Sequence, residues 1–239
     1  MSVAIVIPTY NRGDLLANCL ASIGEHTPER HTTFVMDNGS TDDIKTICKN
    51  HKHVTYTRLD TNTGFGEASN RGAWLAVGHD VVVFLNNDTI VHPGWLAPLT
   101  KVLDTQEDVA IVGSRLLYPD GTLQHAGVNF TLEDNGVLMG HNILTEQPAG
   151  EVIAVTGACM AVERSVFMDY GGFDNGYLNG NEDCDLCLTA RADGWKIWYE
   201  PTSTITHLES QSGAERWTHV GPNIVRLTQK WANKPEVWQ

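Results

Sequence analysis

Apolar and polar positions along the first half of the chain alternate between two kinds of pattern. Short β-branched runs have the composition of strands buried on both faces of a parallel sheet; they cover Val3–Ile7, Thr33–Met36, Val54–Leu59 and Val81–Leu85. Between them lie stretches with apolar residues at helical spacing, at 15–23, 44–48 and 68–75. This order predicts an α/β fold, a Rossmann-like open mixed sheet, mostly parallel and flanked by helices.

The pattern is looser in the second half. After a strand predicted at Val109–Ser114, an apolar run at 152–161 is interrupted by Gly157. A helix is predicted from Asp183 to Ala192, ended by Gly194, and a strand at 195–199 is expected to stop at Pro201. In the first half, Ser40 or Thr41 is expected to cap the helix at 44–48. The 239 residues are enough for one large domain and few for two, so we predict a single unit over residues 1–239.

Polar side chains follow several of the predicted strands. Thr9, Asp37 and the triplet Asn86-Asn87-Asp88 stand at carboxyl ends of strands, where open α/β sheets bind their ligands. The glycine patterns of the P-loop and of dinucleotide-binding folds are both absent from the sequence. A nucleotide would therefore have to be bound by another arrangement.

Three groups of residues could carry chemistry, and each has a structural alternative. Asp88 could hold a divalent cation together with pyrophosphate oxygens, or the triplet could simply form a turn. Glu182 and Asp183 could include a general base, or could cap the helix that they open. His207 could be a metal ligand or an ordinary surface or core histidine.

Composition limits the class of partner and the compartment. The formal net charge of −13 disfavours nucleic acid as a partner, because nucleic-acid binding depends on clustered Lys and Arg. Five cysteines at irregular spacing indicate reduced thiols and a cytoplasmic location. Since the first apolar run stops at Pro8, we expect neither a signal peptide nor a membrane span, with peripheral membrane contact at most.

Six segments, in this order and spacing, resemble glycosyltransferase family 2. They are Val-Ile-Pro-Thr-Tyr-Asn-Arg at 6–12, Asp-Asn-Gly-Ser-Thr-Asp at 37–42, Asn-Thr-Gly-Phe-Gly at 62–66, Leu-Asn-Asn-Asp-Thr at 85–89, Thr-Gly-Ala-Cys at 156–159 and Asn-Glu-Asp-Cys-Asp-Leu at 181–186. The resemblance runs from Val3 to about Leu208 and implies the GT-A fold. It also implies a nucleotide-sugar-binding half at about 1–115 and an acceptor-binding, catalytic half at about 116–239.

The resemblance assigns roles to particular residues. It implies that Pro8, Thr9, Tyr10 and Asp37 surround the base and ribose, and that Asn70 lines the donor pocket. Arg12, Asn87 and the backbone at Gly157 join the implied nucleotide-sugar-binding group. The triplet 86–88 takes the place of the family's Asp-x-Asp motif, but an amide, Asn86, replaces the first carboxylate; Asn86 can still bond the ribose. Asp88 and His207 are the implied ligands of Mn²⁺ or Mg²⁺.

By the same resemblance the chain is an inverting glycosyltransferase with Asp183 as the base, and Glu182 orients that base or binds the acceptor. The donor would be a UDP- or dTDP-linked sugar and the acceptor a saccharide, on a glycan or a lipid carrier. Two alternatives stay open, a sugar nucleotidyltransferase and a non-catalytic nucleotide-sugar-binding module. The former would need cationic groups for a triphosphate.

Overall fold

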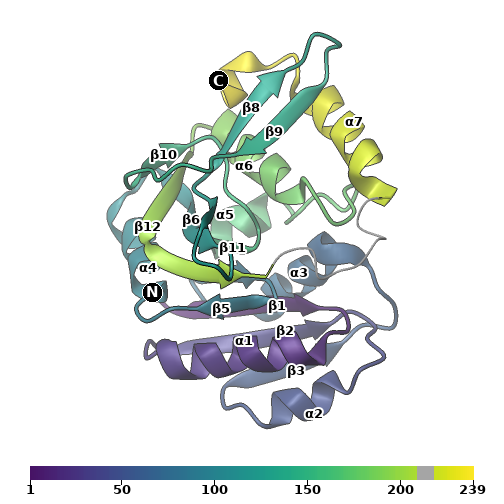
Figure 1. Ribbon diagram of the computed structural model, residues 1–239, viewed down its shortest axis with the longest axis vertical. Helices are drawn as coiled ribbons and strands as arrows, with labels where there is room; N and C mark the ends of the chain where they lie inside the picture. The colour runs from purple at the N-terminus through teal and green to yellow at the C-terminus, as the bar shows by residue number, and fades with distance from the viewer. Residues whose placement is uncertain (209–217) are drawn as a thin grey trace.

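A computed structural model describes residues 1–208 and 218–239 (Figure 1). The helices are α1 (Gly13–His26), α2 (Ile44–Lys49), α3 (Gly64–Leu75), α4 (Leu96–Thr105), α5 (Arg164–Asp169), α6 (Glu182–Ala192), α7 (Val220–Trp231) and α8 (Pro235–Trp238). The strands are β1 (Val3–Thr9), β2 (His31–Asp37), β3 (Val54–Arg58), β4 (Val81–Leu85), β5 (Thr89–Val91), β6 (Val109–Leu117), β7 (Leu123–His125), β8 (Val128–Leu132), β9 (Leu138–Asn142), β10 (Gly150–Val152), β11 (Cys159–Glu163) and β12 (Lys196–His207).

One large sheet joins the two halves of the chain. Its order is β10-β12-β6-β11-β4-β1-β2-β3, with β5 added to β12 and β7 added to β6. The part formed by β4, β1, β2 and β3 is parallel, and β6 is parallel to β12. Strand β11 runs antiparallel between β4 and β6. The predicted open mixed α/β sheet is therefore confirmed, whereas the single-domain assignment stays a prediction.

The sheet is covered by helices on both faces, as the alternation of side chains in β1 requires. Ile5 and its same-face neighbours pack in an apolar cluster with residues of α1, α2 and α4. Ala4 and Val6 face the other way, into a cluster with residues of α3, α5, α6, α7 and α8. A strand buried on both sides explains why the run at 3–7 is apolar at every position.

Two local predictions were wrong. Pro201 does not end a strand, because β12 continues from Lys196 to His207. The proline falls where the pairing of β12 with β6 shifts register, between Glu200 and Thr204, and an irregularity of this kind tolerates a missing N–H. Helix α2 is capped by Asp43, which accepts a hydrogen bond from the Thr46 N–H at 3.1 Å, and not by Ser40 or Thr41.

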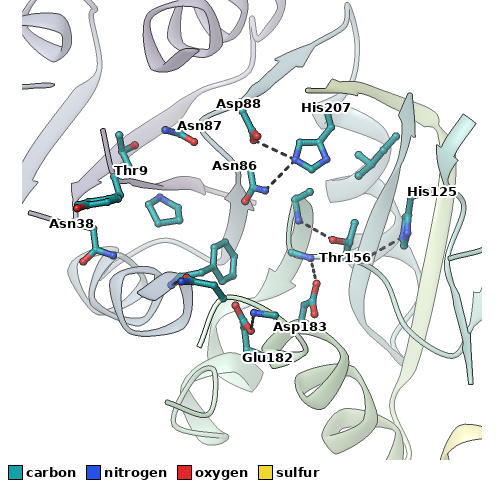
Figure 2. A pocket seen from close by; sticks show the side chains of 18 of the residues that line it. Thr9, Asn38, Asn86, Asn87, Asp88, His125, Thr156, Glu182, Asp183 and His207 are labelled. Carbon is teal, nitrogen blue, oxygen red and sulfur yellow. Dashed lines mark hydrogen bonds and ion pairs between the residues drawn. The ribbon is translucent and has the colours of Figure 1, made fainter. Parts of the chain in front are cut away.

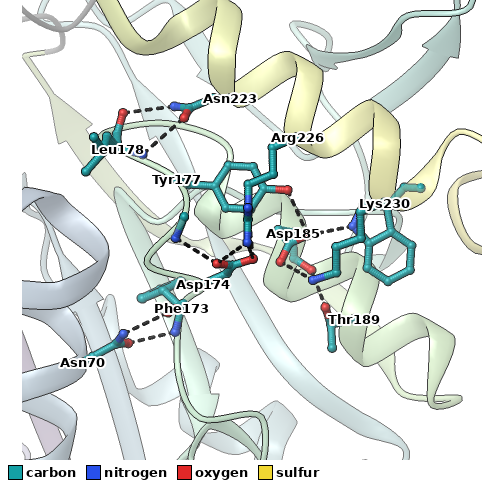
Figure 3. A network of polar contacts seen from close by, with 12 residues as sticks. Asn70, Phe173, Asp174, Tyr177, Leu178, Asp185, Thr189, Asn223, Arg226 and Lys230 are labelled. Carbon is teal, nitrogen blue, oxygen red and sulfur yellow. Dashed lines mark hydrogen bonds and ion pairs between the residues drawn. The ribbon is translucent and has the colours of Figure 1, made fainter.

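Helix α7, the last long helix of the chain, is hydrogen-bonded to the loop that precedes α6 (Figure 3). The side chain of Asn223 accepts from the Leu178 N–H and donates to the carbonyls of Leu178 and Gly180, at 3.2, 3.0 and 2.8 Å. Buried Asp185 of α6 accepts hydrogen bonds from the Lys230 ammonium and the Trp231 indole, each at 2.7 Å. These contacts make α7 part of the support for the loop at 178–180.

Within residues 1–208 and 218–239, no helix combines the length and the apolar character that crossing a membrane would require.

Candidate active site

A cavity of about 300 Å³ opens at the carboxyl ends of β1 and β4 (Figure 2). Ten of the residues predicted from the sequence line it: Pro8, Thr9, Tyr10, Asn86, Asn87, Asp88, Gly157, Glu182, Asp183 and His207. They come from both halves of the chain. The fold thus brings together the two predicted acidic sites, the triplet at 86–88 and the start of α6.

Strand pairing explains how these segments meet. Because β1 and β4 are adjacent and parallel, Thr9 and Asn86 emerge at the same edge of the sheet. Strand β11 runs antiparallel to β4, which places the residues before it beside the end of β4; the Asn86 N–H donates to the Ala158 carbonyl at 3.0 Å. Gly157 is therefore held next to the triplet.

Asp88 and His207 face each other across one side of the cavity. The His207 Nε2 lies 3.2 Å from the Asp88 Oδ1 and 3.3 Å from the Asn86 Nδ2. The Leu208 N–H donates to the Asp88 carbonyl at 3.0 Å, so the backbones of the two segments are joined as well. Asp88 and His207 are nearly buried, with relative exposures of 7% and 9%.

A carboxylate oxygen and an imidazole nitrogen at this separation suit a divalent cation such as Mn²⁺. Within the described part of the chain, no group of three or more His, Cys, Asp or Glu side chains is arranged to hold a metal. Asp88 and His207 therefore fit a site in which the remaining ligands are water and oxygens of a bound diphosphate.

Asp183 stands in the first turn of α6 and points into the cavity (Figure 2). Its Oδ2 accepts a hydrogen bond from the Gly157 N–H at 2.8 Å, and its Oδ1 accepts from the Cys184 N–H at 2.8 Å. The N-cap position of α6 belongs to Asn181, which makes no capping bond through its side chain. Asp183 is thus tied across the cavity wall and is more than a helix cap.

Glu182 has different surroundings although it is the adjacent residue. Its side chain is buried, with 3% relative exposure, and its Oε2 accepts from the Gly180 N–H at 2.6 Å. Burial, and next to it the negative charge of Asp183, raises the pKa of Glu182 to about 7. Glu182 therefore holds a proton at neutral pH far more readily than an exposed glutamate.

Three predicted nucleotide-sugar-binding residues do not line the cavity, and their assignment stays a prediction. Arg12 precedes α1 and pairs with Asp14 at 3.0 Å. The Asn70 amide is buried, donating to the Phe173 carbonyl at 2.9 Å and accepting from the Phe173 N–H at 2.8 Å. Asp37 is the third and is also fully buried.

Asp37 is occupied by its own neighbours. It accepts from the Tyr56 hydroxyl at 2.7 Å, the Arg58 guanidinium at 2.6 Å and the Ser40 N–H at 2.9 Å. Burial by itself raises the pKa of Asp37, but these hydrogen bonds outweigh it and leave the pKa below its ordinary value. The carboxylate therefore fixes the turn after β2, and its neighbour Asn38 lines the cavity instead.

Sequence reasoning missed several lining residues. They are Asn38, Asn62, Phe65, Leu116, Gln124, His125, Asn142, Thr156, Asn179 and Gly180. Asn38, Asn62 and Phe65 belong to the motifs at 37–42 and 62–66. Their membership in these motifs could have identified them as cavity residues. Gln124, His125 and Asn142 lie in the region without clear periodicity, where the sequence offered none.

His125 of β7 illustrates such a missed residue. It is buried, and its Nδ1–H donates to the Asn142 Oδ1 at 3.1 Å while its Nε2 accepts from the Thr156 N–H at 3.3 Å. Burial lowers the pKa of His125 to about 4, so the ring is neutral at physiological pH. It supports the segment that carries Gly157.

The charged residues on the cavity wall are acidic. Asp88, Glu182 and Asp183 are there, and in the described part of the chain no Lys or Arg joins them. A diphosphate placed in this cavity would meet carboxylates and no side-chain cation from these residues. A metal ion between the carboxylates and the anion would offset this repulsion.

Comparison with known proteins agrees with this geometry. Residues 4–171 match the family model described as glycosyl transferase family 2. The chain belongs to this family. The resemblance stated from the six motifs is thereby confirmed.

Curated relatives in family 2 include proteins of much greater length. The chain is 31% identical over 228 residues to an uncharacterised protein of Sinorhizobium fredii, covering 88% of this chain and 25% of that protein. It is 29% identical over 226 residues to the O-antigen biosynthesis protein RfbC of Myxococcus xanthus, covering 88% of this chain and 17% of that protein. The chain thus spans a quarter or less of these two relatives.

A third relative is of more similar size. The N-acetylglucosaminyl-diphospho-decaprenol L-rhamnosyltransferase of Mycobacterium tuberculosis is 25% identical over 242 residues, which cover 87% of this chain and 76% of that enzyme.

Solved structures support the GT-A fold of this family 2 chain. GalNAc-T7 with UDP, GalNAc and Mn²⁺ superimposes with a TM-score of 0.75 at 18% identity, over 89% of this chain and 44% of that one. The mannosyltransferase PcManGT of Pyrobaculum calidifontis with GDP-Man and Mn²⁺ gives a TM-score of 0.70 at 18% identity, over 95% and 64%.

Proposed function

We propose that this chain transfers a sugar from a nucleotide diphosphate sugar to an acceptor hydroxyl, with inversion at the anomeric carbon. The proposal is carried by one observation: a single cavity gathers Asp88 and His207 at one part of its wall and Asp183 at another. Inverting transfer needs this division, because the leaving diphosphate and the attacking hydroxyl lie on opposite sides of the sugar.

Asp88 and His207 would hold Mn²⁺ or Mg²⁺ with the donor diphosphate. When bound, the cation would offset the charge that builds on the departing nucleotide diphosphate. The wall itself supplies carboxylates and, among the described residues, no Lys or Arg. For the same reason a sugar nucleotidyltransferase, which must bind a triphosphate, is less well supported.

Asp183 would accept the proton of the acceptor hydroxyl as its oxygen bonds to the anomeric carbon. The hydrogen bond from Gly157 to Oδ2 fixes the direction of the carboxylate without removing its remaining lone pairs. Pro8, Thr9, Tyr10, Asn86 and Asn87 line the part of the cavity proposed for the nucleotide and its ribose.

A saccharide is the proposed acceptor, on a glycan or a lipid carrier. This rests on the names of two relatives: the Mycobacterium tuberculosis enzyme above, and the O-antigen chain rhamnosyltransferase RfbN of Salmonella typhimurium, 23% identical over 220 residues. UDP- and dTDP-linked sugars are the proposed donors. The chain would act in the cytoplasm and meet a lipid-linked acceptor at the membrane surface.

Three variants test the proposal with a panel of UDP- and dTDP-sugars, assayed with Mn²⁺, Mg²⁺ or EDTA. We expect donor binding, followed by thermal shift, to require the metal and to be lost in Asp88→Asn. Asp183→Asn should still bind the donor but transfer sugar about 10²–10⁴-fold more slowly. Asp104→Asn, at an exposed position in α4, is the matched control.

Each outcome separates the candidates. Metal-dependent donor binding without nucleotide release, even with a range of saccharide acceptors, would identify a non-catalytic module. Transfer by Asp183→Asn at the rate of Asp104→Asn would remove Asp183 from the role of base.

A further inference from the structure

Gln124 of β7 connects to both the ring and the backbone of His207. Its Oε1 lies 2.8 Å from the His207 Nδ1, and its Nε2 donates to the His207 carbonyl at 3.3 Å. Gln124 is buried, with 3% relative exposure, and lines the cavity. A glutamine that is held at both ends of its amide cannot rotate to exchange the two atoms without losing both bonds.

This arrangement assigns the tautomer of His207. Because the NH₂ group of Gln124 faces a carbonyl, the oxygen of the amide faces Nδ1, and Nδ1 must carry the hydrogen. In the neutral ring, Nε2 then presents a lone pair, and the Asn86 Nδ2 lies 3.3 Å from it. The Asp88 Oδ1 lies 3.2 Å from the same Nε2.

We propose that Gln124 is a positioning residue that presents the Nε2 of His207 to the cation. The inference rests on the proposed metal role of Asp88 and His207. A ligand imidazole binds through its unprotonated nitrogen, and the hydrogen bond made by the other nitrogen selects which one that is.

The use of an amide is consistent with the charges of the cavity. A carboxylate often orients a ligand histidine, but three carboxylates already line this wall, at 88, 182 and 183. A neutral glutamine supplies the same acceptor without adding a fourth carboxylate. Its second bond, to the His207 carbonyl, also fixes the end of β12.

The test compares Gln124→Leu with Gln124→Glu. Gln147→Leu is the matched control outside the cavity wall. His207→Ala is the reference for loss of the metal ligand. Two readouts are used: Mn²⁺ affinity in the presence of UDP or dTDP, from the electron paramagnetic resonance signal of free Mn²⁺, and the His207 tautomer in the metal-free protein, from long-range ¹H–¹⁵N spectra. His207 resonances are assigned by their absence from His207→Ala.

We expect Gln124→Leu to weaken Mn²⁺ binding about 10–100-fold and to lose the pure Nδ1–H form of His207. Gln124→Glu keeps an acceptor at Nδ1 but loses the donor to the His207 carbonyl. It should therefore keep the hydrogen on Nδ1 and bind Mn²⁺ more tightly than Gln124→Leu. Gln147→Leu should match the wild type in both readouts. If Gln124→Leu does not fold, the tautomer of His207 in Gln124→Glu still tests the role of Gln124.

If folded Gln124→Leu keeps the wild-type Mn²⁺ affinity and the wild-type tautomer, the role of Gln124 is overturned and the metal site is unaffected. An Nε2–H tautomer of His207 in Gln124→Glu would have the same meaning. Wild-type Mn²⁺ binding by His207→Ala would instead overturn the proposed metal site, and with it any role of Gln124 toward the cation.

Discussion

At the scale of single residues, two adjacent carboxylates receive different surroundings. Asp183 faces the cavity and is bonded by Gly157, whereas Glu182 is buried against Gly180. The raised pKa of Glu182, about 7 compared with an ordinary 4.5, means that folding favours its protonated form. The stability that this form contributes is fully present below about pH 4.5 and is lost as pH rises through about 7.

Glu182→Gln should remove this pH dependence, because a neutral amide can accept the same bond from Gly180. Relative to the wild type, the variant should gain on the order of 3 kcal/mol in free energy of unfolding by about pH 8, and little by about pH 4.5. Urea unfolding across this range measures the difference. Glu25→Gln, at an exposed position in α1, should follow the wild type. If the free energy of unfolding of Glu182→Gln depends on pH in the same way as that of the wild type, Glu182 is charged in the folded state at neutral pH.

At the scale of elements, α3 lies so close to the sheet that one position accepts only glycine. A Cβ on Gly72 would overlap the Val6 side chain of β1 and approach Met36 of β2 to 3.1 Å. In contrast, Gly24 of α1 has nothing within 4 Å of such a Cβ. The two helical glycines thus form a natural pair for comparison.

Gly72→Ala should destabilise the fold by about 1–3 kcal/mol through overpacking. Gly24→Ala should stabilise it by about 0.5–1 kcal/mol, because alanine is the better residue inside a helix. Differential scanning calorimetry of both variants checks the opposite signs. Equal shifts in melting temperature would show that α3 can move away from β1 and β2 at little cost.

Regular elements were predictable from the sequence, and short or irregular ones were not. The runs at 3–7 and 81–85 are buried on both faces, and that burial itself produced the apolar pattern. Strand β7 has three residues, too few to show a period, so Gln124 and His125 could not be placed. Asn70 has the right residue type, but its direction depends on contacts with Phe173, 103 positions away, which no local pattern records.

At the scale of the whole molecule, helix α7 contributes to the site without lining it. Asn223 of α7 holds the backbone of Leu178 and Gly180, and Gly180 lines the cavity (Figure 3). The neighbouring Asn179 in turn accepts a hydrogen bond from the Phe65 N–H at 3.0 Å, at the start of α3. The support therefore runs from α7 through this loop to α3 in the first half of the chain.

Asn223→Ala should release this loop, because three partly buried hydrogen bonds to its backbone are lost. We expect a loss of about 1–3 kcal/mol in free energy of unfolding and faster hydrogen exchange at the Leu178 amide. Asn50→Ala, at an exposed position after α2, should change neither. Unchanged exchange at Leu178 in Asn223→Ala would show that the loop keeps its conformation without α7.

The cysteine thiols of the chain are all enclosed by the fold. Cys19, Cys48, Cys159, Cys184 and Cys187 are free and buried, and burial raises the pKa of each thiol. Oxidants and alkylating reagents act on the exposed thiolate, which the closed molecule does not offer. A modified cysteine in a purified sample therefore identifies a molecule that has opened, at least locally, during its history.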